Sequence, residues 1–118
     1  MGRTNLRPEL EGGRVSLGNQ YWSDVEGGAP VKIRYSISGR IDVPGYLDFI
    51  AERAAWLDIS GWATATGERS VTLVAAGPEA LVGALEMACT LGPLDALVEK
   101  VDAVTEQAPV AAGFKILR

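Results

Sequence analysis

The stretch "VKIRYSISGRIDVPGYLDFI", residues 31–50, contains both of the periodicities on which the fold depends. In its first half, apolar side chains alternate with polar ones, which is typical of a strand with one buried face and one wet face. From residue 44 onward, apolar side chains recur every three or four positions, which predicts a helix that ends just before Gly61. The segment therefore predicts a strand that leads directly into a helix.

The rest of the chain continues with the same two patterns. Helical spacing places one apolar face on each of two predicted helices, made of Tyr46, Phe49, Ile50, Ala54 and Leu57 in the first and of Leu81, Ala84, Leu85 and Ala88 in the second. Pro78 and Glu79 favour a helix start, and Gly92-Pro93 favours a helix end. The remaining elements are a strand hairpin at 62–66 and 70–76, and strands at 96–104 and 113–117.

This order of elements indicates an α+β fold. Strand–helix–strand–strand–helix–strand, followed by a terminal strand, predicts a ferredoxin-like β-α-β-β-α-β sandwich, in which an antiparallel sheet carries two helices on one face. The length of 118 residues fits one such domain, and we assign it to residues 31–118. Because many kinds of protein use this fold, the function has to be argued from the loops.

Residues 1–30 differ from the domain because they are rich in glycine and show no sustained period. We predict an N-terminal extension that is either flexible or docked on the domain. Tyr21 and Trp22 favour docking, since adjacent aromatic rings are better covered than hydrated. A disordered tail is an equally good interpretation of this segment.

Composition excludes several classes of function. The apolar content of 47% indicates a globular protein, and a net charge of −4 argues against a nucleic-acid partner. The chain has no histidine, which excludes Ser–His and Cys–His catalysis, and Cys89 is its only cysteine, so no internal disulfide forms. No apolar run reaches the length of a membrane span, and the N-terminal residues do not have the hydrophobic core of a signal peptide, so we expect no membrane partner and a cytoplasmic location. We expect no cofactor.

Four stretches resemble the acylphosphatase family. "SGRIDVPGYL" (38–47) is similar to the signature S-G-R-V-Q-G-V-G-F-R, and "LDISGWATA" (57–65) is similar to L-G-L-x-G-W-V-x-N. Residues 71–101 match the family's spacing of V-x-V, G-x-x-x-A, G-P and V-x-x-V, and "GFKILR" (113–118) resembles the closing F-x-I-R. The resemblance covers about residues 31–118, and its order and spacing are more specific than any single stretch.

The resemblance implies hydrolysis of carboxyl phosphates without a metal or a covalent intermediate. Backbone N–H groups of the signature loop and the arginine that ends it would hold the phosphoryl group, and the asparagine of the second motif would orient water. In this chain Leu47 stands at the arginine position and Ala65 at the asparagine position. Neither side chain offers charge or a hydrogen bond, so both implied catalytic roles are lost.

The loop itself also departs from the family pattern. Val43 replaces a glycine, Pro44 removes a backbone N–H, and Asp42 brings a negative charge toward a site meant for an anion. We therefore predict a degenerate anion loop, of which four family-like residues remain: Gly39, Arg40, Gly45 and Tyr46.

Three hypotheses follow from these residues. The leading one is a catalytically inactive relative of acylphosphatase that acts by binding a protein partner or a small ligand, through the loop 39–47 or the N-terminal extension. The alternative is an acylphosphatase with a rearranged site. Arg40 is the nearby cation, whereas Arg34 and Lys32 lie on the wet face of the first predicted strand, away from the helix N-terminus, and Arg69 lies in the hairpin turn. A regulatory domain that binds a small molecule or a metal is the third, although paired cysteines and clustered carboxylates are lacking. A homo-oligomer through an exposed sheet edge is possible on any of them.

Overall fold

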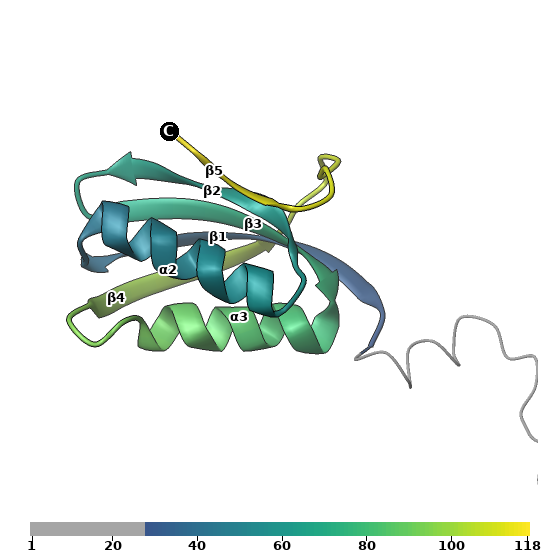
Figure 1. Ribbon diagram of the computed structural model, residues 1–118, viewed down its shortest axis with the longest axis horizontal. Coiled ribbons are helices and arrows are strands. Elements are labelled where there is room, and N and C mark those ends of the chain that lie inside the picture. Colours follow the sequence, from purple (N-terminus) through teal and green to yellow (C-terminus); the bar gives the residue numbers. More distant parts are fainter. Residues whose placement is uncertain (1–27) are drawn as a thin grey trace, which may run out of the picture.

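The computed structural model of the protein describes residues 28–118, which form one sheet and two helices (Figure 1). The predicted N-terminal extension lies almost entirely outside these residues. In chain order, the elements are β1 (Pro30–Arg40), α2 (Val43–Trp56), β2 (Ser60–Gly67), β3 (Ser70–Pro78), α3 (Glu79–Leu91), β4 (Leu97–Thr105) and β5 (Phe114–Leu117).

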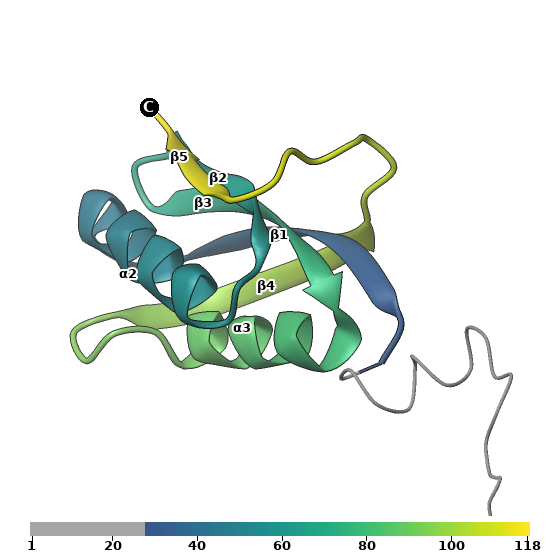
Figure 2. The same ribbon diagram turned by 45° about the vertical axis from the view of Figure 1, so that its right-hand side comes forward.

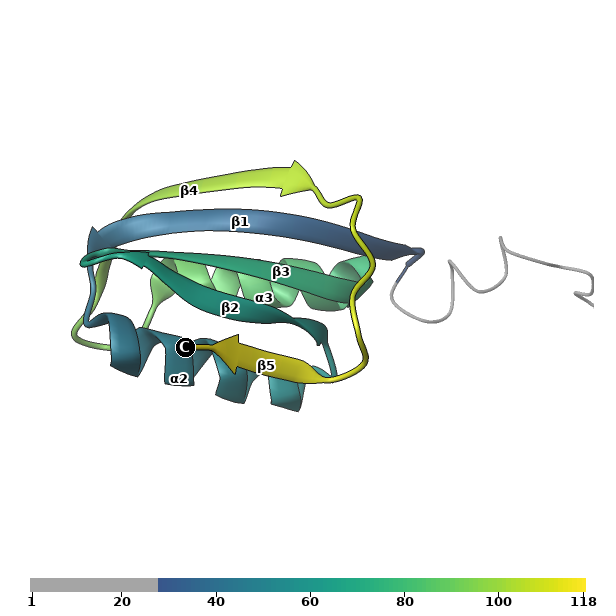
Figure 3. The ribbon, with the colours of Figure 1, turned by 90° about the horizontal axis from the view of Figure 1, so that it is seen from above.

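The five strands form a single sheet in the order β4-β1-β3-β2-β5, as the view from above shows (Figure 3). β1 pairs antiparallel with both β3 and β4, and β2 pairs antiparallel with β3. The predicted α+β architecture is confirmed, with one difference. β5 runs parallel to β2, with Gly61 opposite Phe114, because the segment after β4 crosses to the far edge of the sheet before β5 begins.

Both helices pack on the same face of the sheet (Figure 2). The alternating residues of β1 point toward them, and Tyr35 and Ile37 lie opposite Leu73 and Val71 of β3 in the buried layer. α2 adds five buried side chains to this core, namely Val43, Tyr46, Leu47, Ile50 and Ala54.

The buried face of α3 differs from the prediction. Val82, Leu85 and Cys89 are buried, whereas Ala84 is exposed and Leu81 is only partly covered. The spacing of 82, 85 and 89 forms one stripe on a helix, and residue 84 lies about a quarter turn or more away from that stripe. Because alanine and leucine fit both stripes, the sequence pattern alone did not distinguish them.

The opposite face of the sheet carries a smaller packed group. Val74 of β3 is fully buried there, although it belongs to the face turned away from the helices. The guanidinium of Arg34 lies 5.4 Å from the ring centre of Trp62, and its Nε donates to Glu106 Oε1 at 2.8 Å. Arg34 and Trp62 both pair with Val74 in the sheet register, so they cover it from either side.

The two edges of the sheet are formed by β5 and β4. β5 covers β2 at one edge, and β4 forms the outer strand at the other edge. A homo-oligomer through this edge stays a prediction.

Among the residues that the structure describes, no helix combines the length and the apolar character needed to cross a membrane.

Asp58, directly after α2, adopts a left-handed backbone with φ of 56°. This conformation is strained for a residue with a side chain, and glycine adopts it freely. We expect Asp58→Gly to raise the free energy of unfolding by about 0.5–1 kcal/mol in urea denaturation. Glu52→Gly, at an exposed position inside α2, is the control and should lower it by about 1 kcal/mol. A loss of stability in Asp58→Gly would contradict the assignment of strain.

Candidate functional site

The loop that resembles a phosphate cradle connects β1 to α2, where Gly39 and Arg40 end the strand and Asp42 caps the helix. Gly39 is tightly enclosed by β4, because a Cβ atom there would come within 2.2 Å of the Leu97 carbonyl oxygen. Its N–H donates to the carbonyl of Arg69 at 3.1 Å. The first glycine of the signature therefore fastens the strand to the β2–β3 hairpin.

Two of the N–H groups at the start of α2 have partners within the chain. The Asp42 carboxylate accepts a hydrogen bond from the Gly45 N–H at 3.3 Å, and the Asp42 carbonyl accepts one from the Tyr46 N–H at 2.8 Å. Pro44 has no N–H to offer. A helix N-terminus attracts an anion because its N–H groups are free and its dipole end is positive. Here the carboxylate of Asp42 already fills that role as an ordinary N-cap.

Leu47, at the position of the family's arginine, lies in the hydrophobic core with 3% of its surface exposed. It follows Val43 by four residues and precedes Ile50 by three, so all three side chains lie on the buried face of α2. The prediction treated this position only as a lost charge and left it out of the core. The structure shows that Leu47 is a packing residue.

Ala65, at the position of the family's asparagine, is exposed near the end of β2. It lies opposite Val71 of β3, just before the bulge that leads into the hairpin turn. A methyl group at this position cannot orient a water molecule. Val43, which replaces the loop glycine, is buried as the first residue of α2.

The cations that could replace the family's arginine differ in whether they already have a partner. Lys32 and Arg34 are engaged elsewhere, since Lys32 Nζ donates to the Ala108 carbonyl at 2.6 Å and Arg34 pairs with Glu106. Arg40 and Arg69 are exposed. Arg118, which the sequence analysis did not consider, places its guanidinium 3.2 Å from Asp48 Oδ1, one residue after Leu47 in α2.

Tyr46, which the sequence analysis placed both in the loop and on the apolar face of the first helix, is a structural residue. Its ring is 1% exposed, and its hydroxyl donates to the backbone carbonyl of Cys89 at 2.5 Å. Burial raises the pKa of the Tyr46 phenol, and the nearby Cys89 thiol adds to the shift. The phenol therefore stays protonated and ties α2 to α3.

Cys89 is buried in the same place, and burial raises its thiol pKa to about 12. Because thiol reagents attack the thiolate, we expect alkylation of folded protein at neutral pH to be about a thousand times slower than for a free thiol. Mass spectrometry of iodoacetamide labelling measures this rate. Met87→Cys, at a position 66% exposed on the same helix, should add a site that labels quickly. Equal rates at the two positions would contradict the burial of Cys89.

The sequence contained signals for two of these features that the prediction did not use. Asp directly before the first helical residue is a preferred N-cap, so the pairing of Asp42 with Gly45 could have been expected. The spacing of Leu47 with Val43 and Ile50 also indicated burial. By contrast, no sequence signal placed Arg118 beside Asp48, because that contact depends on the path of the chain after β4.

The metal-binding form of the third hypothesis gains no support from this geometry. Within residues 28–118, the side chains of His, Cys, Asp and Glu do not gather in groups of three that could hold a metal ion. A cavity of about 110 Å³ adjoins the loop, between the start of α2 and the segment before β4, and its acidic side chains are Asp42 and Asp95.

Comparison with known proteins extends the sequence resemblance. Residues 33–116 match the family model for acylphosphatase. An acylphosphatase of Salinibacter ruber is 34% identical over 95 residues, which cover 80% of this chain and 100% of that protein. An acylphosphatase of Azorhizobium caulinodans is 35% identical over 81 residues, which cover 68% of this chain and 87% of that protein.

Solved structures agree in fold. An acylphosphatase from Coxiella burnetii superposes with a TM-score of 0.69 at 22% identity, over 75% of this chain and 93% of that one. An acylphosphatase from Bacillus subtilis superposes with a TM-score of 0.68 at 20% identity, over 75% and 99%. Because the family model spans the whole sandwich and the relatives match along most of their length, the chain belongs to the acylphosphatase family.

Proposed function

We propose that this chain is an acylphosphatase-family domain that binds a partner or ligand and no longer hydrolyses carboxyl phosphates. The observation that carries the proposal is the state of the α2 N-terminus, where the Asp42 carboxylate accepts from the Gly45 N–H in place of an external anion. A phosphoryl group there would meet a like charge and fewer free donors. The cytoplasmic location and the absence of a nucleic-acid partner stay predictions.

The two substituted positions support the same proposal. The buried Leu47 provides no cation at the base of the loop, and Ala65 provides no donor or acceptor for water. Removal of a single charge-stabilising donor from an enzyme site typically lowers kcat by about a hundred- to a thousandfold. Loss of both roles would therefore leave little acceleration over the reaction in water.

The alternative is an acylphosphatase with a rearranged site. The comparisons by themselves favour it, because the relatives that match this chain are named as acylphosphatases. One contact also supports it. Arg118 reaches the first turns of α2 through Asp48, so a shift of this side chain would bring a guanidinium toward the loop. Arg40, exposed at the end of β1, is the second candidate cation.

An assay of the full-length protein with benzoyl phosphate separates the two functions. We expect the wild type to hydrolyse it no faster than buffer does. Turnover that falls at least tenfold in Arg118→Ala or Arg40→Ala, but not in the matched control Lys100→Ala on the open face of the sheet, would establish the alternative and overturn the proposal.

Binding of inorganic phosphate tests the loop directly. In the wild type we expect no saturable shift of the Gly45 and Tyr46 amide resonances up to millimolar phosphate. Asp42→Asn keeps an N-cap and removes the charge, so it should strengthen phosphate binding at these amides about tenfold if the carboxylate is what excludes the anion. Tight phosphate binding by the wild type would contradict an internally capped helix.

A further inference from the structure

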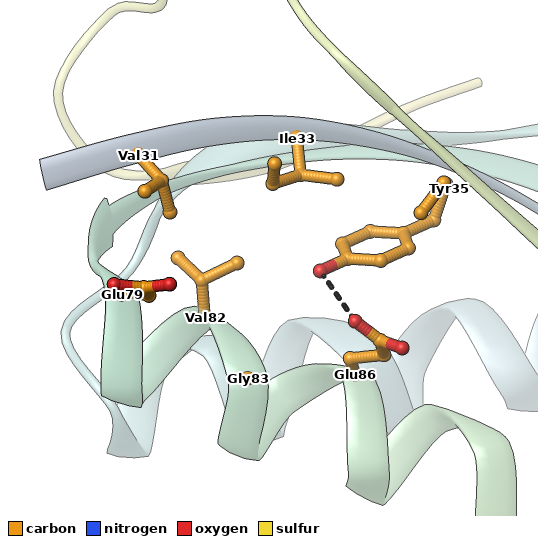
Figure 4. A pocket seen from close by; sticks show the side chains of 8 residues that line it. Val31, Ile33, Tyr35, Glu79, Val82, Gly83 and Glu86 are labelled. Carbon is orange, nitrogen blue, oxygen red and sulfur yellow. Dashed lines mark hydrogen bonds between the residues drawn. The ribbon is translucent and has the colours of Figure 1, made fainter.

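A cavity of about 240 Å³ lies at the opposite end of β1 from the loop, between β1, β4 and the first half of α3 (Figure 4). Its floor is apolar, since Val31 and Ile33 of β1 face Val82 of α3 across it. The α3 side carries two carboxylates, Glu79 and Glu86, together with Gly83. This helix face would normally be filled with apolar side chains against the sheet.

Gly83 has no packing reason to be glycine. A Cβ atom at this position would meet nothing within 4 Å, and the residue lies in the middle of α3, where glycine weakens a helix relative to alanine. Gly83 and Glu86 also line a neighbouring cavity of about 340 Å³ on the outer side of α3. The missing side chain therefore leaves an open groove on this face of the helix.

The two carboxylates are placed on either side of this space. Glu79 and Glu86 are seven residues apart, which is two helical turns, so they project from the same face of α3. The Tyr35 hydroxyl donates to Glu86 Oε1 at 3.0 Å and fixes that carboxylate at the cavity (Figure 4). Among the ion pairs within residues 28–118, neither Glu79 nor Glu86 has a Lys or Arg partner. The apolar floor strengthens the attraction of these charges for a cation.

We propose that this cavity binds a small organic cation, with its ammonium group paired with the Glu86 carboxylate and its apolar body lying on Val31, Ile33 and Val82. Glu79, two helical turns away, adds to the negative potential. Charge complementarity selects the cation, and the apolar floor selects an organic one over a hydrated metal ion. The volume limits the ligand to about the size of one aromatic ring with a short arm. The proposal does not depend on whether the protein hydrolyses acyl phosphates.

Titration of the full-length ¹⁵N-labelled protein with benzylamine, observed by NMR at neutral pH and low salt, tests this site. We expect saturable shifts of the Ile33, Val82 and Gly83 amides. Benzyl alcohol, the neutral analogue of the same shape, should bind about tenfold more weakly, because a charge-assisted hydrogen bond is lost. Benzoate should not bind. Glu79→Gln combined with Glu86→Gln should remove the preference for the amine over the alcohol.

A variant that fills the groove tests whether the ligand binds beside Gly83. Gly83→Leu should abolish the shifts, whereas Ala84→Leu, which adds the same side chain at the next exposed position of α3, should change the affinity less than about twofold. Equal binding of amine and alcohol, or retained binding in Gly83→Leu, would overturn the proposal. So would cross-peaks in the free protein between residues 1–27 and Ile33 or Val82, which would identify the chain's own segment as the occupant.

Discussion

Gly61→Ala is expected to lower the free energy of unfolding by at least about 3 kcal/mol, a large part of the 5–15 kcal/mol that holds a typical domain together. Gly61 is buried in β2 with φ of 144°, a backbone conformation that residues with side chains rarely adopt. A Cβ atom there would come within 1.8 Å of the Val74 carbonyl oxygen in β3. Because this neighbour is backbone in the middle of the sheet, it cannot move aside without breaking the pairing of β2 with β3.

β2 also cannot move away from β3 to make room for the methyl group, because β5 holds it from the other side. The Gly61 N–H donates to the carbonyl of Gly113 at 3.0 Å, and Gly61 pairs with Phe114 of β5. A displaced β2 would therefore weaken its contact with β5 as well. Thermal unfolding followed by circular dichroism should show a midpoint lowered by at least about 12–24 °C, from the usual 4–8 °C per kcal/mol in a domain of this size.

Gly83→Ala is the matched control for this variant. It makes the same chemical change at a glycine where nothing lies near the new methyl group, and it should raise stability by up to about 1 kcal/mol through helix propensity. A loss of less than about 1 kcal/mol in Gly61→Ala would show that the sheet can accommodate a side chain here, against the stated geometry.

Leu47→Arg, which reinstates the residue that the family resemblance implies, is expected to lower the free energy of unfolding by about 3–5 kcal/mol. The reason is burial. Leu47 is 3% exposed among core residues, so an arginine would lose the packing of the leucine and place a cation without a partner in an apolar site. Urea denaturation followed by circular dichroism measures the change.

Leu47→Met is the control, since a swap of similar volume in a core typically changes stability by less than about 1.5 kcal/mol. A Leu47→Arg variant as stable as Leu47→Met would show that the arginine leaves the core and reaches the loop. In that case hydrolysis of benzoyl phosphate by the variant should be measured, and any gain over wild type would show that the cradle needs only a cation to function.

Much of the fold was readable from local pattern. The alternation at 31–37 and the helical spacing after Pro44 are periodicities of neighbouring residues, and they predict β1 and the start of α2 closely. The predicted end of the helix, just before Gly61, was wrong, because α2 ends at Trp56 and Asp58 adopts a left-handed backbone. Patterns that depend on which of two stripes meets the sheet were less reliable. Ala84 was predicted to be covered and is exposed, because small side chains do not distinguish adjacent faces of α3.

The residues of the site were also predictable only in part. The sequence by itself identified the substituted positions, Leu47 and Ala65, because a motif is read from residue types and spacing alone. It could not show that Leu47 is a core residue, that the Asp42 carboxylate caps Gly45, or that Arg118 reaches Asp48.

The cavity beside Gly83 was invisible to sequence analysis for a physical reason. Its walls come from the start of β1, from β4 and from α3, which run from Val31 to Ala103 in the chain and are brought together only by the sheet order β4-β1-β3. Residue types and periodicity therefore determined the family, the elements and the altered loop. Long-range packing alone decided which N–H groups are occupied, which side chains are buried and where open space remains, because each of these depends on partners distant in the chain.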